Sequence, residues 1–236
     1  MKLNETLYRH LSTIEDIRFV LDIGFGYPSF LFEIYHQFNA LACIGTDLSE
    51  LKSVVSGSTI ESYIAKLSEL DLTTISYLID DRDRSVEFYN SYKVYTTLVL
   101  GERPLGSAEF KRNFQLYFSR SIQDYLLDER PWMELDVIIG SNVLSHINPN
   151  EEHNADWVLG KLLERLSERG LIYLSLRSDD YEPQINQGVL SSTIVAPFDT
   201  VRLEGVLNKL DVIHKETVTR EYDGKRSFEI IARKKL

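Results

Sequence analysis

The sequence has almost no cysteine and no long run of apolar residues. Cys43 is the only cysteine in 236 residues, so no disulfide can form within the chain and a thiolate-rich metal site is excluded. No apolar run reaches the length of a membrane span, and the first residues, MKLNETLYRH, lack the apolar stretch of a signal peptide. We therefore expect a cytoplasmic protein that does not enter a membrane.

Basic residues are also fewer than acidic ones. The chain has 26 lysines and arginines against 36 aspartates and glutamates, which gives a formal net charge of −10. Because nonspecific nucleic-acid binding depends on positive charge, this composition argues against a nucleic-acid partner. A small-molecule substrate, or a protein partner such as a second copy in a homodimer, fits better. His146 and His153 lack a third ligand, so no metal site is expected.

What the sequence does contain is an alternation of apolar strands with helical patterns. The strand patterns cover residues 20–23, 40–47, 114–122, 135–144 and 171–177. The helical patterns cover residues 3–18, 29–38, 156–170 and 203–210, and a hairpin turned at Asp223-Gly224 is expected over 212–234. Gly170 is expected to end the helix over 156–170. This alternation predicts an α/β fold with a mostly parallel sheet, helices on both faces and an antiparallel edge.

The carboxyl ends of the predicted strands are the places to look for a site, because open α/β sheets bind ligands there. After the first strand, in VLDIGFGYPSF (20–30), Gly24 and Gly26 offer a turn without Cβ atoms, which lets a ligand approach the backbone. Asp47 ends the second strand, 21 residues after Gly26. At that separation a carboxylate reaches a ribose and accepts hydrogen bonds from both hydroxyls.

Five segments, in this order, resemble the class I S-adenosylmethionine-dependent methyltransferases over most of the chain. LDIGFG is similar to the family's first motif, and GTDLS to its second. LDVIIGSNVLSHI is similar to the fourth motif, and RGLIYLSLR to the strand that follows it. The segment PFDTVRLEGVLNKLDVIHKE, followed by a hairpin, is similar to the family's C-terminal end.

The resemblance implies a Rossmann-like, mostly parallel seven-stranded sheet with a C-terminal antiparallel hairpin, S-adenosyl-L-methionine as cofactor, and methyl transfer to oxygen or nitrogen of a small molecule. It implies that the glycine turn receives the methionine part, with Asp22 orienting the loop and the cofactor's amino group. It implies a cofactor-binding set of Asp22, Gly24, Gly26, Asp47, Ser121, Ile122, Ser141 and Asn142. His146 is the candidate general base for a hydroxyl acceptor.

Other interpretations stand beside these. Asp22 can be a buried carboxylate that caps local amides, and His146 a packing or cap residue. Pro28 replaces the family's third glycine and Ser121 its acidic adenine contact, which leaves open a catalytically inactive partner or scaffold subunit. GFGYPS also nearly fits a dinucleotide-binding turn, so a nicotinamide-dependent oxidoreductase is a further alternative.

Residues 51–113 form a longer connection than a helix crossover needs. The segment is rich in tyrosine and charge, and we expect a helical insertion within a single domain spanning 1–236. Such an insertion can cover the substrate site, with Tyr89, Tyr92 and Tyr95 lining it. A surface elaboration or dimer contact is an equally good interpretation.

Overall fold

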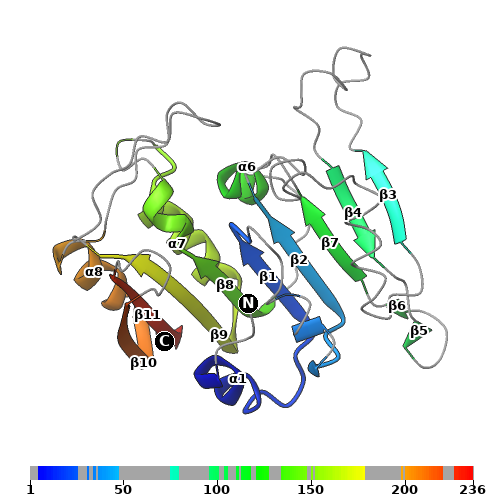
Figure 1. Cartoon of the computed structure of the whole chain (residues 1–236), viewed down its shortest axis with the longest axis horizontal. Helices are drawn as coiled ribbons and strands as arrows, with labels where there is room; N and C mark the ends of the chain where they lie inside the picture. Colours follow the sequence, from blue (N-terminus) through cyan, green and yellow to red (C-terminus); the bar gives the residue numbers. More distant parts are fainter. Residues whose placement is uncertain are drawn as a thin grey trace. The chain divides into compact units, whose positions relative to one another are not determined.

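The chain divides into two compact units. Figure 1 labels their helices and strands. Unit 1 comprises Glu15–Asp128, and unit 2 comprises Glu5–Ile14 with Glu129–Leu236. The computed structural model describes residues 5–25, 31, 34–35, 37–47, 75–79, 96–100, 104–105, 110–111, 113–117, 121–127, 134–147, 150, 152–178, 198, 200–219 and 226–235. Among the described helices, none combines the length and the apolar character that crossing a membrane requires.

Unit 1 is built on a mixed sheet in the order β1-β2-β7-β4-β3. Its strands are β1 (Phe19–Ile23), β2 (Ala42–Thr46), β7 (Asn113–Tyr117), β4 (Thr96–Leu100) and β3 (Ile75–Ile79). β1, β2 and β7 run parallel to one another, and β4 and β3 continue the sheet antiparallel. A separate two-stranded pair joins β5 (Pro104–Leu105) to β6 (Phe110–Lys111).

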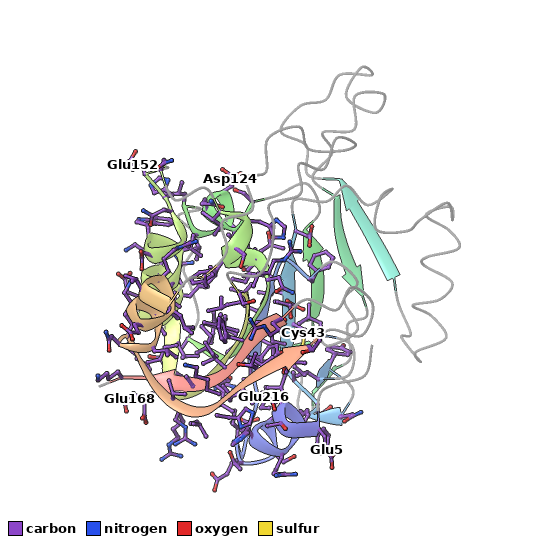
Figure 2. All side chains as sticks on the ribbon, turned by 60° about the vertical axis from the view of Figure 1, so that its left-hand side comes forward. Glu5, Cys43, Asp124, Glu152, Glu168 and Glu216 are labelled. Carbon is purple, nitrogen blue, oxygen red and sulfur yellow. The ribbon has the colours of Figure 1, made fainter. Side chains whose placement is uncertain are left out.

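Most apolar residues of β1 and β2 in unit 1 are buried. Val20, Leu21 and Ile23 on β1 are fully buried, and so is Cys43 on β2 (Figure 2). The predicted helix over 29–38 is represented by Leu31, Ile34 and Tyr35, which are helical and buried. The short helix α6 (Ile122–Leu127) follows β7.

Unit 2 is built on the strand order β10-β11-β9-β8. The strands are β8 (Leu135–Ser141), β9 (Leu166–Arg177), β10 (Leu210–Thr219) and β11 (Arg226–Lys234). β8 and β9 are parallel, whereas β11 runs antiparallel to both β9 and β10, which confirms the predicted hairpin. The Asp223-Gly224 turn itself lies outside the described residues.

The helices of unit 2 are α1 (Glu5–Leu11), η1 (Val143–His146, a 3-10 helix), α7 (Ala155–Arg165) and α8 (Thr200–Leu207). The buried residues of α7 recur at the spacing of one helical face, which explains the helical pattern of the sequence: Ala155, Val158, Leu159, Leu162 and Leu163. The charged side chains of Glu152 and Glu168 lie at the periphery of this unit (Figure 2).

Several predicted boundaries were wrong. The helix predicted over 3–18 is described only from Glu5 to Leu11. The strand predicted over 114–122 ends at Tyr117, and Ile122 begins α6. The strand predicted over 135–144 ends at Ser141 because Asn142 adopts a left-handed conformation.

The predicted role of Gly170 was also wrong. α7 ends at Arg165, and Leu166 through Gly170 belong to β9, where Leu166 pairs with Leu135 of β8. Gly170 is buried, and a Cβ atom there would meet Leu166 Cδ1 at 2.7 Å and the Leu135 carbonyl oxygen at 3.0 Å. The glycine therefore permits close packing inside a strand instead of ending a helix.

The helical insertion expected over 51–113 is not helical where it is described. The described parts are β3, β4, β5 and β6, and residues such as Ile75, Ile79, Thr96 and Val99 are of the β-branched kind that favours strands. β3 and β4 also give the sheets more strands and more antiparallel pairs than expected. Tyr89, Tyr92 and Tyr95 lie outside the described residues, and the lid, the single domain and the homodimer stay predictions.

We predict that Gly170→Ala destabilises the protein, because the new methyl group meets backbone as well as side-chain atoms. The expected loss is about 1–3 kcal/mol of unfolding free energy, the usual range for overpacking. Gly160→Ala in α7 is the matched control, since a Cβ at that position meets nothing within 4 Å. The control should gain about 0.5–1 kcal/mol from helix propensity. Urea unfolding of both variants measures the difference, and equal stability would contradict the packing role of Gly170.

Candidate functional site

At the carboxyl ends of β1 and β2, a backbone hydrogen bond links the turn that follows β1 to the last residue of β2. In the parallel register Asp22 lies opposite Gly45, and Ile23 lies opposite Thr46. Gly24 follows with a φ of 66°, and its N–H donates to the Thr46 carbonyl oxygen at 2.7 Å. That φ lies in the left-handed region, which glycine adopts without steric cost. Because this conformation is not extended, β1 ends before Gly24.

Two carboxyl groups are buried at this edge of unit 1. Asp22 is 3% exposed and Asp47, directly after β2, is 8% exposed. Oδ1 of Asp22 has no hydrogen-bond partner among the described residues, so at least this oxygen caps no local amide there. Burial, and then the charge of Asp47, raise the pKa of Asp22 well above its usual range.

Ser121 and Ile122 follow β7 in the same unit. The Ser121 hydroxyl accepts a hydrogen bond from the Asp124 amide at 2.9 Å and donates to Asp124 Oδ2 at 2.6 Å. Ser121 is therefore the N-cap of α6, and its hydroxyl interacts within the helix start. Ile122 is buried, with 4% of its surface exposed.

The carboxyl ends of β8 and β9 in unit 2 form a second polar cluster. Asn142 has a φ of 61°, and its N–H donates to the Ser175 carbonyl oxygen at 2.7 Å. The Ser175 hydroxyl donates to Asn142 Oδ1 at 3.4 Å, and the fully buried Ser145 hydroxyl accepts from the Arg177 amide at 3.2 Å. These bonds tie η1 to β9, and His146 is the half-buried last residue of η1.

No family model matches the sequence, and no curated protein sequence matches it. Solved structures do match the fold. A SAM-dependent methyltransferase from Methanosarcina mazei is 15% identical, with 100% of each chain covered and a TM-score of 0.56. The N-methyltransferase NodS from Bradyrhizobium japonicum is 9% identical, with 98% of this chain and 93% of NodS covered and a TM-score of 0.54. A 1,6-didemethyltoxoflavin-N1-methyltransferase from Burkholderia thailandensis, solved with 1,6-didemethyltoxoflavin and S-adenosylhomocysteine, is 15% identical, with 98% of this chain and 76% of that chain covered and a TM-score of 0.55. The chain has the class I methyltransferase fold.

Within this methyltransferase fold, unit 1 brings together three of the residues singled out in the sequence. Asp22, Gly24 and Asp47 meet where adjacent parallel strands end. Tyr117 aligns with Thr46 at the end of β7, so Ser121 follows a strand that ends at the same edge. Ser141, Asn142 and His146 belong to unit 2, and Gly26, Pro28 and Ser29 lie outside the described residues.

Sequence reasoning missed two residues of the unit 2 cluster, Ser175 and Arg177, whereas Ser145 lies in the segment Ser141 to His146 that the sequence singled out. The available signal was the serine that interrupts the apolar run LIYLSLR near the carboxyl end of its strand. A buried serine there needs a polar partner, and the turn after the neighbouring strand supplies it. In the part of the chain that the structure describes, no group of three metal-ligating side chains is present.

We predict that Ser121→Ala lowers the unfolding free energy by about 1 kcal/mol, because it removes the N-cap of α6. Ser121→Asn should stay close to the wild type, since asparagine is an equally good N-cap. Chemical denaturation of the three proteins measures the effect. If both variants match the wild type, the cap contributes nothing to stability.

We predict that Asn142→Ala destabilises the protein by about 1 kcal/mol, because alanine tolerates a left-handed backbone poorly. Asn142→Gly should recover most of that loss. Asn39, with a φ of 56°, is the matched control for the backbone effect alone. Any deficit of Asn142→Gly beyond that of Asn39→Gly then reports the side-chain bond to Ser175. Thermal unfolding of the three variants and the wild type tests this, and wild-type stability of Asn142→Ala would contradict it.

Proposed function

We propose that the chain binds S-adenosyl-L-methionine and transfers its methyl group to oxygen or nitrogen of a small-molecule acceptor. The observation that carries this proposal is the carboxyl edge of β1 and β2. A left-handed glycine turn and two buried carboxyls adjoin there, and one carboxyl oxygen has no partner among the described residues.

The chemistry of these residues fits the cofactor. The cofactor's amino group is a cation and hydrogen-bond donor, and one oxygen of the Asp22 carboxyl receives no hydrogen bond from the described residues. The two ribose hydroxyls are donors that a single carboxylate can accept, which suits Asp47. Gly24 has no Cβ atom, so its backbone is open to a ligand.

The chain's own residues then contribute binding, orientation and proton transfer. When bound, S-adenosylmethionine supplies an electrophilic methyl group on its sulfonium sulfur. Asp22 holds the amino group and Asp47 the ribose of the ligand, and the apolar strands behind them keep water out of that part of the site. For a hydroxyl acceptor, His146 is the proposed base that takes the proton on an imidazole nitrogen. An amine acceptor needs no such base.

Two features support a small molecule as the acceptor. The net charge of −10 does not suit a polyanionic partner. A structural neighbour, the Burkholderia enzyme, was solved with a small heterocyclic substrate, 1,6-didemethyltoxoflavin.

A second candidate is a catalytically inactive subunit that uses the same fold as a scaffold. The observation that favours it is the Ser121 hydroxyl, which bonds to Asp124 within α6 and stands where the resemblance implies an adenine contact. A stable complex with another protein, together with ligand binding but no turnover, is the result expected of such a subunit.

We predict that S-adenosylmethionine and S-adenosylhomocysteine bind the purified protein with micromolar affinity, measured by isothermal titration calorimetry. Asp47→Ala should weaken both ligands by roughly 10- to 100-fold, the equivalent of hydrogen bonds to a charged group. Asp211→Ala, an exposed position on β10 in unit 2, is the matched control and should bind like the wild type. Circular dichroism confirms that each variant is folded.

The titration, together with melting temperatures measured with each ligand, decides between the enzyme proposal and the oxidoreductase. No binding of either compound would overturn the enzyme proposal. A melting temperature raised by NAD and left unchanged by S-adenosylmethionine would favour the nicotinamide-dependent oxidoreductase instead.

A further inference from the structure

Asp22 and Asp47 pose an electrostatic problem at the edge of unit 1. Both carboxyls are buried, at 3% and 8% exposure, and they end adjacent parallel strands. Two carboxylates in a site of low polarity repel each other and lose their hydration, so both can be ionised only if a cation or several donors compensate.

For Asp22, the described residues supply no opposite charge that acts on the carboxyl and no partner for Oδ1. Asp22 Oδ1 lacks a hydrogen-bond partner there, and the charged group that acts on Asp22 is Asp47, whose sign is the same. Arg18, four residues before Asp22 in the sequence, precedes the amino end of β1, and its guanidinium lies over the Phe19 ring. Burial and the neighbouring charge therefore both raise the pKa of Asp22.

Resting on the proposed function, we infer that Asp22 holds a proton in the ligand-free protein and releases it to solvent when the ammonium group of the ligand binds. The exchange balances: the carboxyl O–H bond breaks, the proton passes to a buffer base, and the carboxylate that remains pairs with the ammonium. The site then holds two carboxylates and one cation instead of one carboxylate and one neutral acid.

This exchange predicts two properties of ligand binding. Binding should strengthen as the pH rises toward the ligand-free pKa of Asp22, because at lower pH the proton must first be removed. The effect also requires a ligand with an amino group. S-adenosylhomocysteine has one, whereas 5′-methylthioadenosine carries the adenosine without it.

Calorimetry in buffers of different ionisation enthalpy counts the protons released on binding. Between the ligand-bound and the ligand-free pKa of Asp22, S-adenosylhomocysteine should release up to about one proton per molecule bound, and the number should fall as the pH passes the ligand-free pKa. For 5′-methylthioadenosine the enthalpy should not depend on the buffer. Asp22→Asn should abolish the release with S-adenosylhomocysteine. Asp16→Asn, an exposed position of the same unit, should retain it.

Carbon-13 NMR of the aspartate carboxyls tests the ligand-free state directly, with the Asp22 signal identified by its loss in Asp22→Asn. That signal should titrate at higher pH than those of exposed aspartates. Stability gives an independent measure. A raised folded pKa means that the wild type loses stability as pH rises from the unfolded pKa through the folded one, and Asp22→Asn should lack that loss.

The outcomes separate the two proposals. Binding of S-adenosylhomocysteine without proton release, or an Asp22 signal that titrates with the exposed aspartates, overturns the proton exchange and leaves the methyltransferase proposal standing. No binding of S-adenosylmethionine or S-adenosylhomocysteine overturns the methyltransferase proposal and the release step with it. The NMR titration then still decides whether the free protein holds the proton.

Discussion

The parallel pairing of β1 with β2 is the interaction on which the site in unit 1 depends. Its register sets Ile23 opposite Thr46, which brings the Gly24 amide to the Thr46 carbonyl oxygen at 2.7 Å. The pairing also buries both strands, and buried strands keep Asp22 and Asp47 away from water. The backbone structure of this edge and the burial of the two carboxyls are thus determined by the same few residues.

Both units end a parallel strand in the same way. Gly24 and Asn142 have φ values of 66° and 61°, and each amide donates to a carbonyl of the neighbouring parallel strand at 2.7 Å. In unit 1 glycine adopts this conformation without steric cost, and Gly24 itself has no side chain. In unit 2 asparagine adopts it, and its side chain accepts a bond from Ser175. The same backbone conformation is therefore adopted by a residue without a side chain in unit 1 and by a residue with a hydrogen-bonded side chain in unit 2.

The burial of Asp22 lowers the stability of the folded protein. A buried polar atom without a partner costs about 1–3 kcal/mol, and Asp22 Oδ1 has no hydrogen-bond partner among the described residues. The apolar strand around it offsets that loss in the folded protein. Conflicts of this kind between local chemistry and packing are typical of functional sites, because a ligand can resolve what the protein leaves unsatisfied.

The sequence by itself determined the class of fold and the location of the candidate site. Apolar strands, the glycine turn and Asp47 are local features with a fixed periodicity, so they predicted parallel strands with Asp22, Gly24 and Asp47 at their ends. Only the tertiary structure decided the rest. Gly170 belongs to a strand because Leu166 pairs with Leu135, Ser121 caps α6, and β3 and β4 extend the sheet where a helical insertion was expected. Such outcomes depend on partners far apart in the chain, and the protonation of Asp22 depends on burial, which no local pattern encodes.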